Sequence, residues 1–148
     1  MSTRSKTFSY DVALEWEGDR RSTLAAGPRP AILSGPPEDF PHGEQERWSP
    51  EHLFLGALSS CTLLSFLAHC AHRHVEVRSY SAVASGTIER RAQDGRYAFV
   101  AVHLRPEVVV ASGQVGDAHE LTAKAERDCF VSASTTATVD VEWVITEG

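Results

Sequence analysis

The sequence predicts an α+β fold built mostly from antiparallel sheets wrapped around central helices, and three observations lead to this class. Large apolar residues occupy every second position over residues 8–17, with Ala13 and polar residues between them, which predicts a half-buried strand. Two long strand-like segments, 77–90 and 96–110, are joined by the hairpin signal Ala92-Gln93-Asp94-Gly95. The segment Leu53–Ala71 contains no Asp, Glu, Lys or Arg and predicts a central helix that the strands cover.

The first third of the chain predicts short strands followed by a long loop. Gly18-Asp19 ends the first strand, and the apolar runs 22–26 and 31–33 predict two further strands around the Gly27-Pro28 turn. Residues 34–50 form a loop that contains four prolines and the aromatic residues Phe40 and Trp48. Because so long a connection in a compact domain usually serves a function, we expect Ser34–Trp48 to line an apolar pocket through these two aromatic rings.

The central helix has a clear start. Ser49 can accept a backbone hydrogen bond as the N-cap, Pro50 occupies the first helical position, and Glu51 faces the positive end of the helix dipole. We expect this helix to run to about His72. Its apolar stretch is nearly long enough to cross a bilayer. A polar stripe along it argues against a membrane, since these side chains share one face: Ser59, Thr62, Ser65 and His69.

The C-terminal third predicts one helix and one strand. Asp117 followed by Glu120 resembles a capping box, which predicts a helix through about Asp128 with Cys129 at its exit. The alternation of Val139–Ile145 predicts the last strand. The order β-β-β-α-β-β-α-β, with hairpins in place of regular crossovers, supports the α+β assignment.

Length and composition exclude several classes of protein. The 148 residues fit a single domain spanning 1–148. The chain has 14 Lys and Arg against 20 Asp and Glu, a net charge of −6, which argues against a nucleic-acid partner. Three cysteines are too few for a disulfide scaffold, and no secretory signal opens the sequence. We therefore expect a cytoplasmic protein whose cysteines, where they matter, act chemically.

Two motifs resemble those of the OsmC/Ohr family of hydroperoxide peroxidases. Ser49-Pro50-Glu51-His52-Leu53-Phe54, followed by Ala57-Leu58-Ser59-Ser60-Cys61, is similar to the helix start that places Pro-Glu ten residues before the reactive cysteine. Cys129-Phe130-Val131-Ser132 resembles the second motif, in which a cysteine is followed by Pro-x-Ser, although Phe130 replaces the proline. The match covers nearly the whole chain and implies an OsmC-like intertwined dimer.

The resemblance implies a thiol-dependent peroxidase that reduces organic hydroperoxides. Cys61 would attack the peroxide and Cys129 would resolve the sulfenic acid as a disulfide, which a dithiol such as dihydrolipoamide would reduce; no bound cofactor is implied. Cys70 lies about 13 Å along the helix from Cys61, too far to form a disulfide, and is expected to be a buried bystander. We also expect Cys129 to keep its proton, because it follows a helix C-terminus beside Glu126 and Asp128.

A cation is needed to activate Cys61, and the resemblance implies an arginine held by Glu51. Arg20 in Gly18-Asp19-Arg20 is our first choice, followed by Arg47 and then Arg21. Glu51 and Cys61 are separated by about 15 Å of helix rise, too far for one arginine to reach both easily. A homodimer that brings Glu51 of one protomer near Cys61 of its partner removes this difficulty.

Other functions compete with the peroxidase. His69, His72 and His74 with Cys70 do not match a recognised zinc pattern, so we expect no metal. The fold could instead serve a non-catalytic dimer that binds an apolar ligand. A redox sensor that signals through a disulfide between Cys61 and Cys129 is the third alternative.

Overall fold

The computed structural model describes residues 5–148 and divides the chain into two compact units, one ending at Leu53 and one running from Phe54 to Gly148. Helices and sheets are mixed along the chain, which confirms the predicted α+β class. The prediction of a single domain spanning 1–148 stays a prediction.

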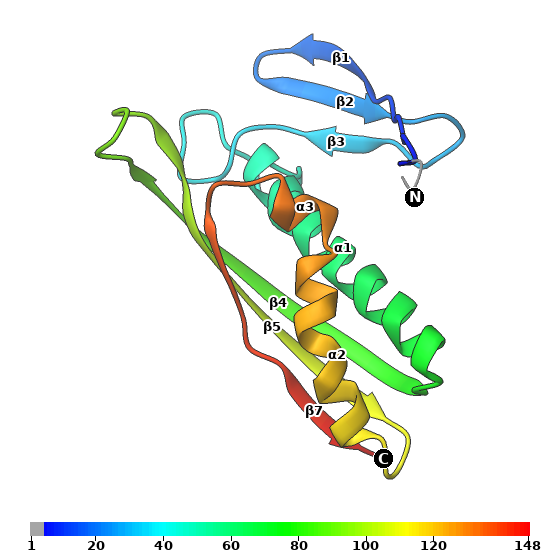
Figure 1. The fold of residues 1–148 in the computed structure, drawn as a ribbon. Helices are drawn as coiled ribbons and strands as arrows, with labels where there is room; N and C mark the ends of the chain where they lie inside the picture. The colour runs from blue at the N-terminus through cyan, green and yellow to red at the C-terminus, as the bar shows by residue number, and fades with distance from the viewer. Residues whose placement is uncertain (1–4) are drawn as a thin grey trace. The chain divides into compact units, whose positions relative to one another are not determined.

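The first unit contains a small antiparallel sheet of β1 (Ala13–Gly18), β2 (Arg21–Ala25) and β3 (Ile32–Ser34) (Figure 1). The predicted first strand is wrong for residues 8–12, which are not in a strand. The register explains this difference: Ala13 pairs with Ala25, the last residue of β2, so earlier residues extend past their neighbour. The expected burial is also wrong within this chain, since Trp16 is 73% exposed.

The loop between β3 and the first helix is ordered by its own backbone. Two successive turns form where the Phe40 N–H bonds the Pro37 carbonyl and the Gly43 N–H bonds the Phe40 carbonyl, each at 3.0 Å. A Cβ at Gly43 would lie 2.1 Å from the Pro37 carbonyl oxygen, so only glycine fits there. At its end, Trp48 bridges to Ser34 beside β3, which closes the loop onto the sheet.

Helix α1 (Pro50–Arg73) begins as predicted. The Ser49 hydroxyl accepts the backbone N–H of His52 at 3.1 Å and caps the first turn. By length and composition α1 could cross a bilayer. Its buried residues recur every fourth position, however, and several of them belong to the core of the second unit: Leu58, Thr62, Phe66 and Cys70. These features are consistent with the core helix of a folded domain.

The second unit is organised by the hairpin of β4 (Val77–Arg90) and β5 (Tyr97–Val110), with Gly95 in the left-handed conformation at its turn (φ 69°). β6 (Thr138–Val141) and β7 (Val144–Glu147) both pair with β5 in parallel, so this sheet is mixed. The single last strand predicted for Val139–Ile145 is wrong. It is broken where the Glu142 N–H reaches back to the Leu104 carbonyl at 2.8 Å.

Two further helices follow β5: α2 (Val115–Arg127) and the short α3 (Phe130–Ala133). The predicted capping box is wrong, because α2 begins two residues before Asp117 and no side chain caps it. Gln114, at the N-cap position, instead accepts the Glu76 N–H at 2.8 Å through its side-chain oxygen. The predicted end is confirmed, since Asp128 is the C-cap.

The core of the second unit lies between the sheet and the helices. From Phe54 onward, α1 lies with α2 on one side of β4 and β5 (Figure 1). Phe66, Leu121 and Val108 join α1, α2 and β5 in one cluster, while Leu58 packs with β5 in a second. This packing places the end of α2, and with it Cys129, against the middle of α1.

Candidate functional site

The second unit brings Cys61 and Cys129 together, although 68 residues separate them in the sequence. Cys61 lies on α1 and is partly exposed, whereas Cys129 lies between α2 and α3 and is 1% exposed. The two thiols lie close enough that each shifts the pKa of the other, and both are free. Cys70 is buried in a different cluster, where burial raises its pKa to about 11. The fold of the second unit therefore places these two free thiols near each other.

Hydrogen bonds to the Cys129 sulfur shift its pKa downward. Burial by itself raises this pKa, but the backbone N–H of Ser132 and the hydroxyl of Thr62 outweigh that effect, with a smaller contribution from the Cys61 thiol. The Thr62 oxygen lies 3.6 Å from the Cys129 sulfur. The direction of this shift is opposite to the one expected from the helix C-terminus and the acidic neighbours, and the protonation of Cys129 stays a prediction.

The acidic neighbours of Cys129 fail to oppose this shift because both are engaged elsewhere. The Asp128 carboxylate binds the Arg127 guanidinium at 2.9 and 3.0 Å and His69 Nε2 at 2.8 Å. These hydrogen bonds, that of Arg127 first, lower the pKa of Asp128 to about 2. The Glu126 carboxylate accepts the Trp143 indole N–H at 3.2 Å. The charge of Asp128 is thus balanced by Arg127, and the Glu126 carboxylate is held by a neutral donor.

The Cys61 thiol has the opposite shift. Burial raises its pKa, and the neighbouring Cys129 thiol raises it further, while the backbone N–H groups of Val131 and Phe130 lower it. Phe130 stands where the family motif has proline, and a proline would have no N–H to offer here. Among the groups that act on Cys61 within residues 54–148, no cationic side chain appears.

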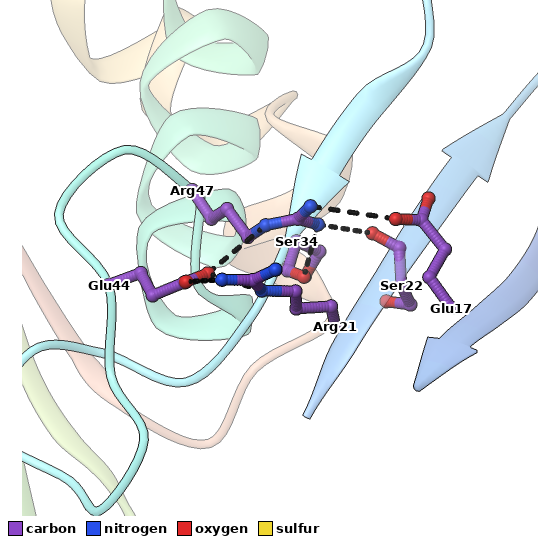
Figure 2. Close-up of polar contacts among 6 residues, drawn as sticks. All are labelled: Glu17, Arg21, Ser22, Ser34, Glu44 and Arg47. Atoms are coloured by element: carbon purple, nitrogen blue, oxygen red, sulfur yellow. Dashed lines mark hydrogen bonds and ion pairs between the residues drawn. The ribbon is translucent and has the colours of Figure 1, made fainter. Parts of the chain in front are cut away.

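The first unit holds two of the three candidate arginines in a network of ion pairs (Figure 2). Arg21 and Arg47 both bind the Glu44 carboxylate, Arg47 with its Nε at 3.1 Å. Arg47 also reaches Glu17 at 3.5 Å and the Ser22 carbonyl at 3.4 Å. The Glu44 hydrogen bond and charge raise the pKa of Arg21. Both guanidinium groups therefore tie the loop to the sheet.

Arg20 and Glu51 differ from these paired groups. Within residues 5–148, no hydrogen bond or ion pair engages the Arg20 side chain, and the buried Glu51 Oε2 likewise has no hydrogen-bond partner. Both residues line the same cavity of about 530 Å³. Its apolar walls include Leu14, Trp16 and Phe40. An unpaired cation and an unpaired carboxylate thus share one apolar cavity.

Trp48 does not line this cavity, so that part of the loop prediction is wrong. It lines a smaller hollow with Arg47 and His52, because its backbone pairing with Ser34 fixes it beside the end of β3. His52 also contacts the Ser49 hydroxyl through Nδ1 at 2.6 Å.

No metal-binding cluster of three His, Cys, Asp or Glu side chains occurs among the described residues. His69 pairs with Asp128, as given above. His103 lies 3.0 Å from Asp140 and 3.3 Å from Glu142, on exposed side chains.

Sequence reasoning missed three contributors to the site. Glu44 gave no signal, since one glutamate in a long loop has no recognisable spacing. The contribution of the Phe130 N–H was missed because Phe130 was treated only as a departure from the proline of the family motif. Thr62 was visible as part of the polar stripe on the central helix, but its contact with Cys129 depends on the packing of α2.

The chain matches a family model described as OsmC-like protein over residues 43–144. It is 25% identical over 139 residues to the uncharacterized protein YmaD of Bacillus subtilis strain 168, covering 90% of each chain. A structure of an OsmC-like protein of unknown function from Vibrio cholerae is similar with a TM-score of 0.81 and 25% identity, covering 93% of this chain and 100% of that one.

The fold is also shared with a more distant structure. An organic hydroperoxide resistance protein from Elizabethkingia anophelis matches with a TM-score of 0.74 and 15% identity, covering 98% of this chain and 100% of that chain.

Proposed function

The chain belongs to the OsmC-like family, and on this premise we propose that it is a thiol-dependent peroxidase that reduces organic hydroperoxides. The observation that carries the proposal is the proximity of the Cys61 and Cys129 thiols, each of which shifts the pKa of the other in the reduced protein. The name of the Elizabethkingia anophelis protein, with its similar fold, supports the same chemistry. Cys61 is the attacking thiol because it is the more exposed of the pair.

The reaction runs through two sulfur intermediates. The Cys61 thiolate attacks the terminal oxygen of the hydroperoxide, the O–O bond breaks, and the alcohol leaves after taking up a proton. The Cys129 thiolate then attacks the resulting Cys61 sulfenic acid and expels hydroxide, which leaves as water after protonation. The disulfide between the two cysteines carries both oxidising equivalents. An external dithiol, dihydrolipoamide being the candidate, returns it to two thiols.

Arg20 is the cation that we assign to the activation of Cys61, held by Glu51. Arg21 and Arg47 are paired with Glu44, and Arg47 also with Glu17, whereas Arg20 and the buried Glu51 oxygen line the same cavity and have no partner among residues 5–148. A guanidinium beside a thiol stabilises the thiolate and would reverse the raised pKa of Cys61. The apolar walls of this cavity fit the alkyl or aryl group of an organic hydroperoxide.

The site is completed in a homodimer in this proposal. The ten residues between Glu51 and Cys61 correspond to about 15 Å along one continuous helix. In a dimer, Glu51 of one protomer can instead lie near Cys61 of its partner. Unpaired apolar side chains support such a partner, since Leu64 on α1 is 62% exposed and Trp16 on β1 is 73% exposed. We place the protein in the cytoplasm, where dithiol reductants are available.

The decisive experiment follows consumption of cumene hydroperoxide or tert-butyl hydroperoxide by the purified protein with a dithiol reductant. We expect turnover in the wild type, none in Cys61→Ser, and slower turnover in Cys129→Ser, in which the dithiol has to reduce the Cys61 sulfenic acid directly. Replacement of Arg20 by Ala should slow Cys61 oxidation about 100-fold, by removal of one stabilising charge. Arg47→Ala is the matched control and should slow it far less. A monomeric mass in solution would contradict the assembled site.

A non-catalytic protein that binds an apolar ligand is the second candidate. Two observations favour it: the raised pKa of Cys61 and the apolar cavity of the first unit. Absence of turnover with any reductant, together with a Cys61 that resists alkylation near neutral pH, would select this candidate. Oxidation to the disulfide without sustained turnover would select the redox sensor.

A further inference from the structure

The polar stripe of α1 contacts the segment that carries Cys129 at three points. The Thr62 hydroxyl lies 3.6 Å from the Cys129 sulfur. The Ser65 hydroxyl donates to the Ala125 carbonyl at 2.8 Å, and His69 Nε2 lies 2.8 Å from the Asp128 carboxylate. The last two contacts fix the end of α2 along α1, and Thr62 contacts the sulfur itself.

We propose that Thr62 is a further catalytic residue, which stabilises Cys129 as the leaving group when the disulfide is reduced, so that the reductant attacks Cys61. The proposal rests on the function proposed above and concerns its second half. Burial supports it, because Thr62 and Cys129 are 2% and 1% exposed, whereas Cys61 is partly exposed. A thiolate from outside can therefore reach the sulfur of Cys61 and not that of Cys129.

The Thr62 hydroxyl has two acceptors within reach. Its oxygen lies 2.9 Å from the Leu58 carbonyl one turn earlier in α1, and 3.6 Å from the Cys129 sulfur. A hydroxyl has one hydrogen and can donate it to one acceptor at a time. With a neutral sulfur the carbonyl is the stronger acceptor, but a thiolate attracts the hydrogen more strongly than a carbonyl does. Charge that develops on Cys129 is thus met by a donor already in place.

The dithiol reduces the disulfide between Cys61 and Cys129 in two thiol–disulfide exchanges. The first thiolate of the dithiol attacks the Cys61 sulfur, a bond forms between those two sulfurs, and the bond to Cys129 breaks. Cys129 leaves with the electron pair and receives the Thr62 hydrogen bond. The second thiol of the reductant loses its proton and attacks the reductant's first sulfur, which is bonded to Cys61. The bond between that sulfur and Cys61 breaks, and Cys61 is released as a thiolate. The dithiol is oxidised to a cyclic disulfide, and two protons pass from it to the two cysteines.

The first test measures disulfide reduction without any hydroperoxide. The disulfide is formed with diamide, and its reduction by dithiothreitol is followed in a single turnover for three variants. Thr62→Val should slow reduction by about three- to tenfold, as expected for loss of a hydrogen bond to a developing charge. Thr62→Ser should restore the rate. Thr122→Val is the matched control, because the Thr122 hydroxyl also donates to a backbone carbonyl, that of His119 at 2.8 Å, but lies on α2 away from the sulfur.

A second readout separates the chemical role of Thr62 from a structural one. In a Cys61→Ser background, the thiolate absorbance of Cys129 is titrated with Thr or Val at position 62. We expect a higher pKa for Cys129 with Val. Equal titration curves, or equal reduction rates for wild type and Thr62→Val, would overturn the proposal.

The site of attack is tested with a monothiol. The diamide-formed disulfide is treated briefly with 2-mercaptoethanol, quenched with acid, and mapped by mass spectrometry. We expect the adduct on Cys61, with Cys129 free, and an adduct mainly on Cys129 would refute the proposed direction. Because no step here uses a hydroperoxide, a protein that fails the peroxidase assay still gives a clear answer on Thr62.

Discussion

The Tyr80 hydroxyl is a buried polar group without a hydrogen-bond partner in the part of the chain that the structure describes. Its ring contacts Phe66 and Trp143, with centroids 6.3 and 6.5 Å away. Tyr80→Phe keeps the ring and removes the hydroxyl, so it relieves the cost of an unsatisfied group. We expect the free energy of unfolding to rise by about 1–2 kcal/mol near neutral pH, the lower part of the range for such groups.

The gain in stability should grow in alkaline solution. Burial raises the pKa of Tyr80 from 10.0 to about 12, so the unfolded chain releases this proton at a lower pH than the folded chain. In the wild type, the contribution of this raised pKa to the free energy of unfolding is therefore fully present below pH 10 and is lost as the pH rises towards 12. Tyr80→Phe has no such loss. The full effect would be about 2.7 kcal/mol, which we reduce to about 1 kcal/mol because the ring is only partly buried.

Urea unfolding followed by tryptophan fluorescence, at pH 7 and again near pH 11, measures both effects. Tyr97→Phe is the matched control: it removes a phenol from a side chain that is 76% exposed, and should change stability by less than about 0.5 kcal/mol. A Tyr80→Phe variant that is less stable than wild type would refute the reasoning, since it would mean that the hydroxyl has a partner. An advantage that shrinks between pH 7 and pH 11 would refute the linkage.

Three further predictions concern the caps and the thiols. Ser49→Ala removes the acceptor of the His52 N–H and should lower the free energy of unfolding by about 1 kcal/mol in urea, with Ser49→Asp retaining most of it. Iodoacetamide at pH 8 should modify Cys61 before Cys70, whose pKa is about 11, as mass spectrometry of the native protein would detect. The ionised Asp128 carboxylate stabilises the wild type above about pH 4, and this stabilisation is lost as the pH falls towards 2. Asp128→Asn should lack it, so the free energy of unfolding should fall less between pH 4 and pH 2 than in the wild type.

The elements best predicted from the sequence are those whose signals are local. The start of α1 follows from Ser49-Pro50-Glu51, because a cap and a proline act within one turn. The hairpin of β4 and β5 follows from Asp94-Gly95, whose backbone conformation only a few residues adopt easily. Such signals need no knowledge of the rest of the fold.

Predictions that depend on distant partners were less accurate. Alternation at 8–12 indicates a strand, but a strand exists only beside a neighbour, and β2 ends opposite Ala13. The alternation of Val139–Ile145 continues through a break that is fixed by Leu104 on β5. Asp117 fits a capping pattern, yet α2 starts earlier because Gln114 is held by the connection between α1 and β4. In each case tertiary contacts override the local pattern.

The candidate site also contains features that the sequence predicted and features that it did not. The resemblance to a family predicted the pairing of Cys61 and Cys129, and the second unit places their thiols near each other, while the disulfide itself stays a prediction. The direction of the shift in the Cys129 pKa was not predicted, because hydrogen bonds from Ser132 and Thr62 lower it and the contact with Thr62 is not visible in the sequence. Charge proximity along a chain is therefore a poor guide to a pKa that hydrogen bonds from residues distant in sequence also shift.

The two halves of the proposed reaction depend on different groups. Reduction of the disulfide uses Cys61, Cys129 and Thr62, all of which the second unit supplies. Peroxide attack needs a Cys61 thiolate, whose pKa stays raised among the groups of that unit, so it depends on Arg20 in addition. An Arg20→Ala variant should therefore lose attack on hydroperoxide while its diamide-formed disulfide is reduced at the wild-type rate. Equal losses in both steps would show that the arginine supports the fold of the cysteine pair and does not act on the peroxide.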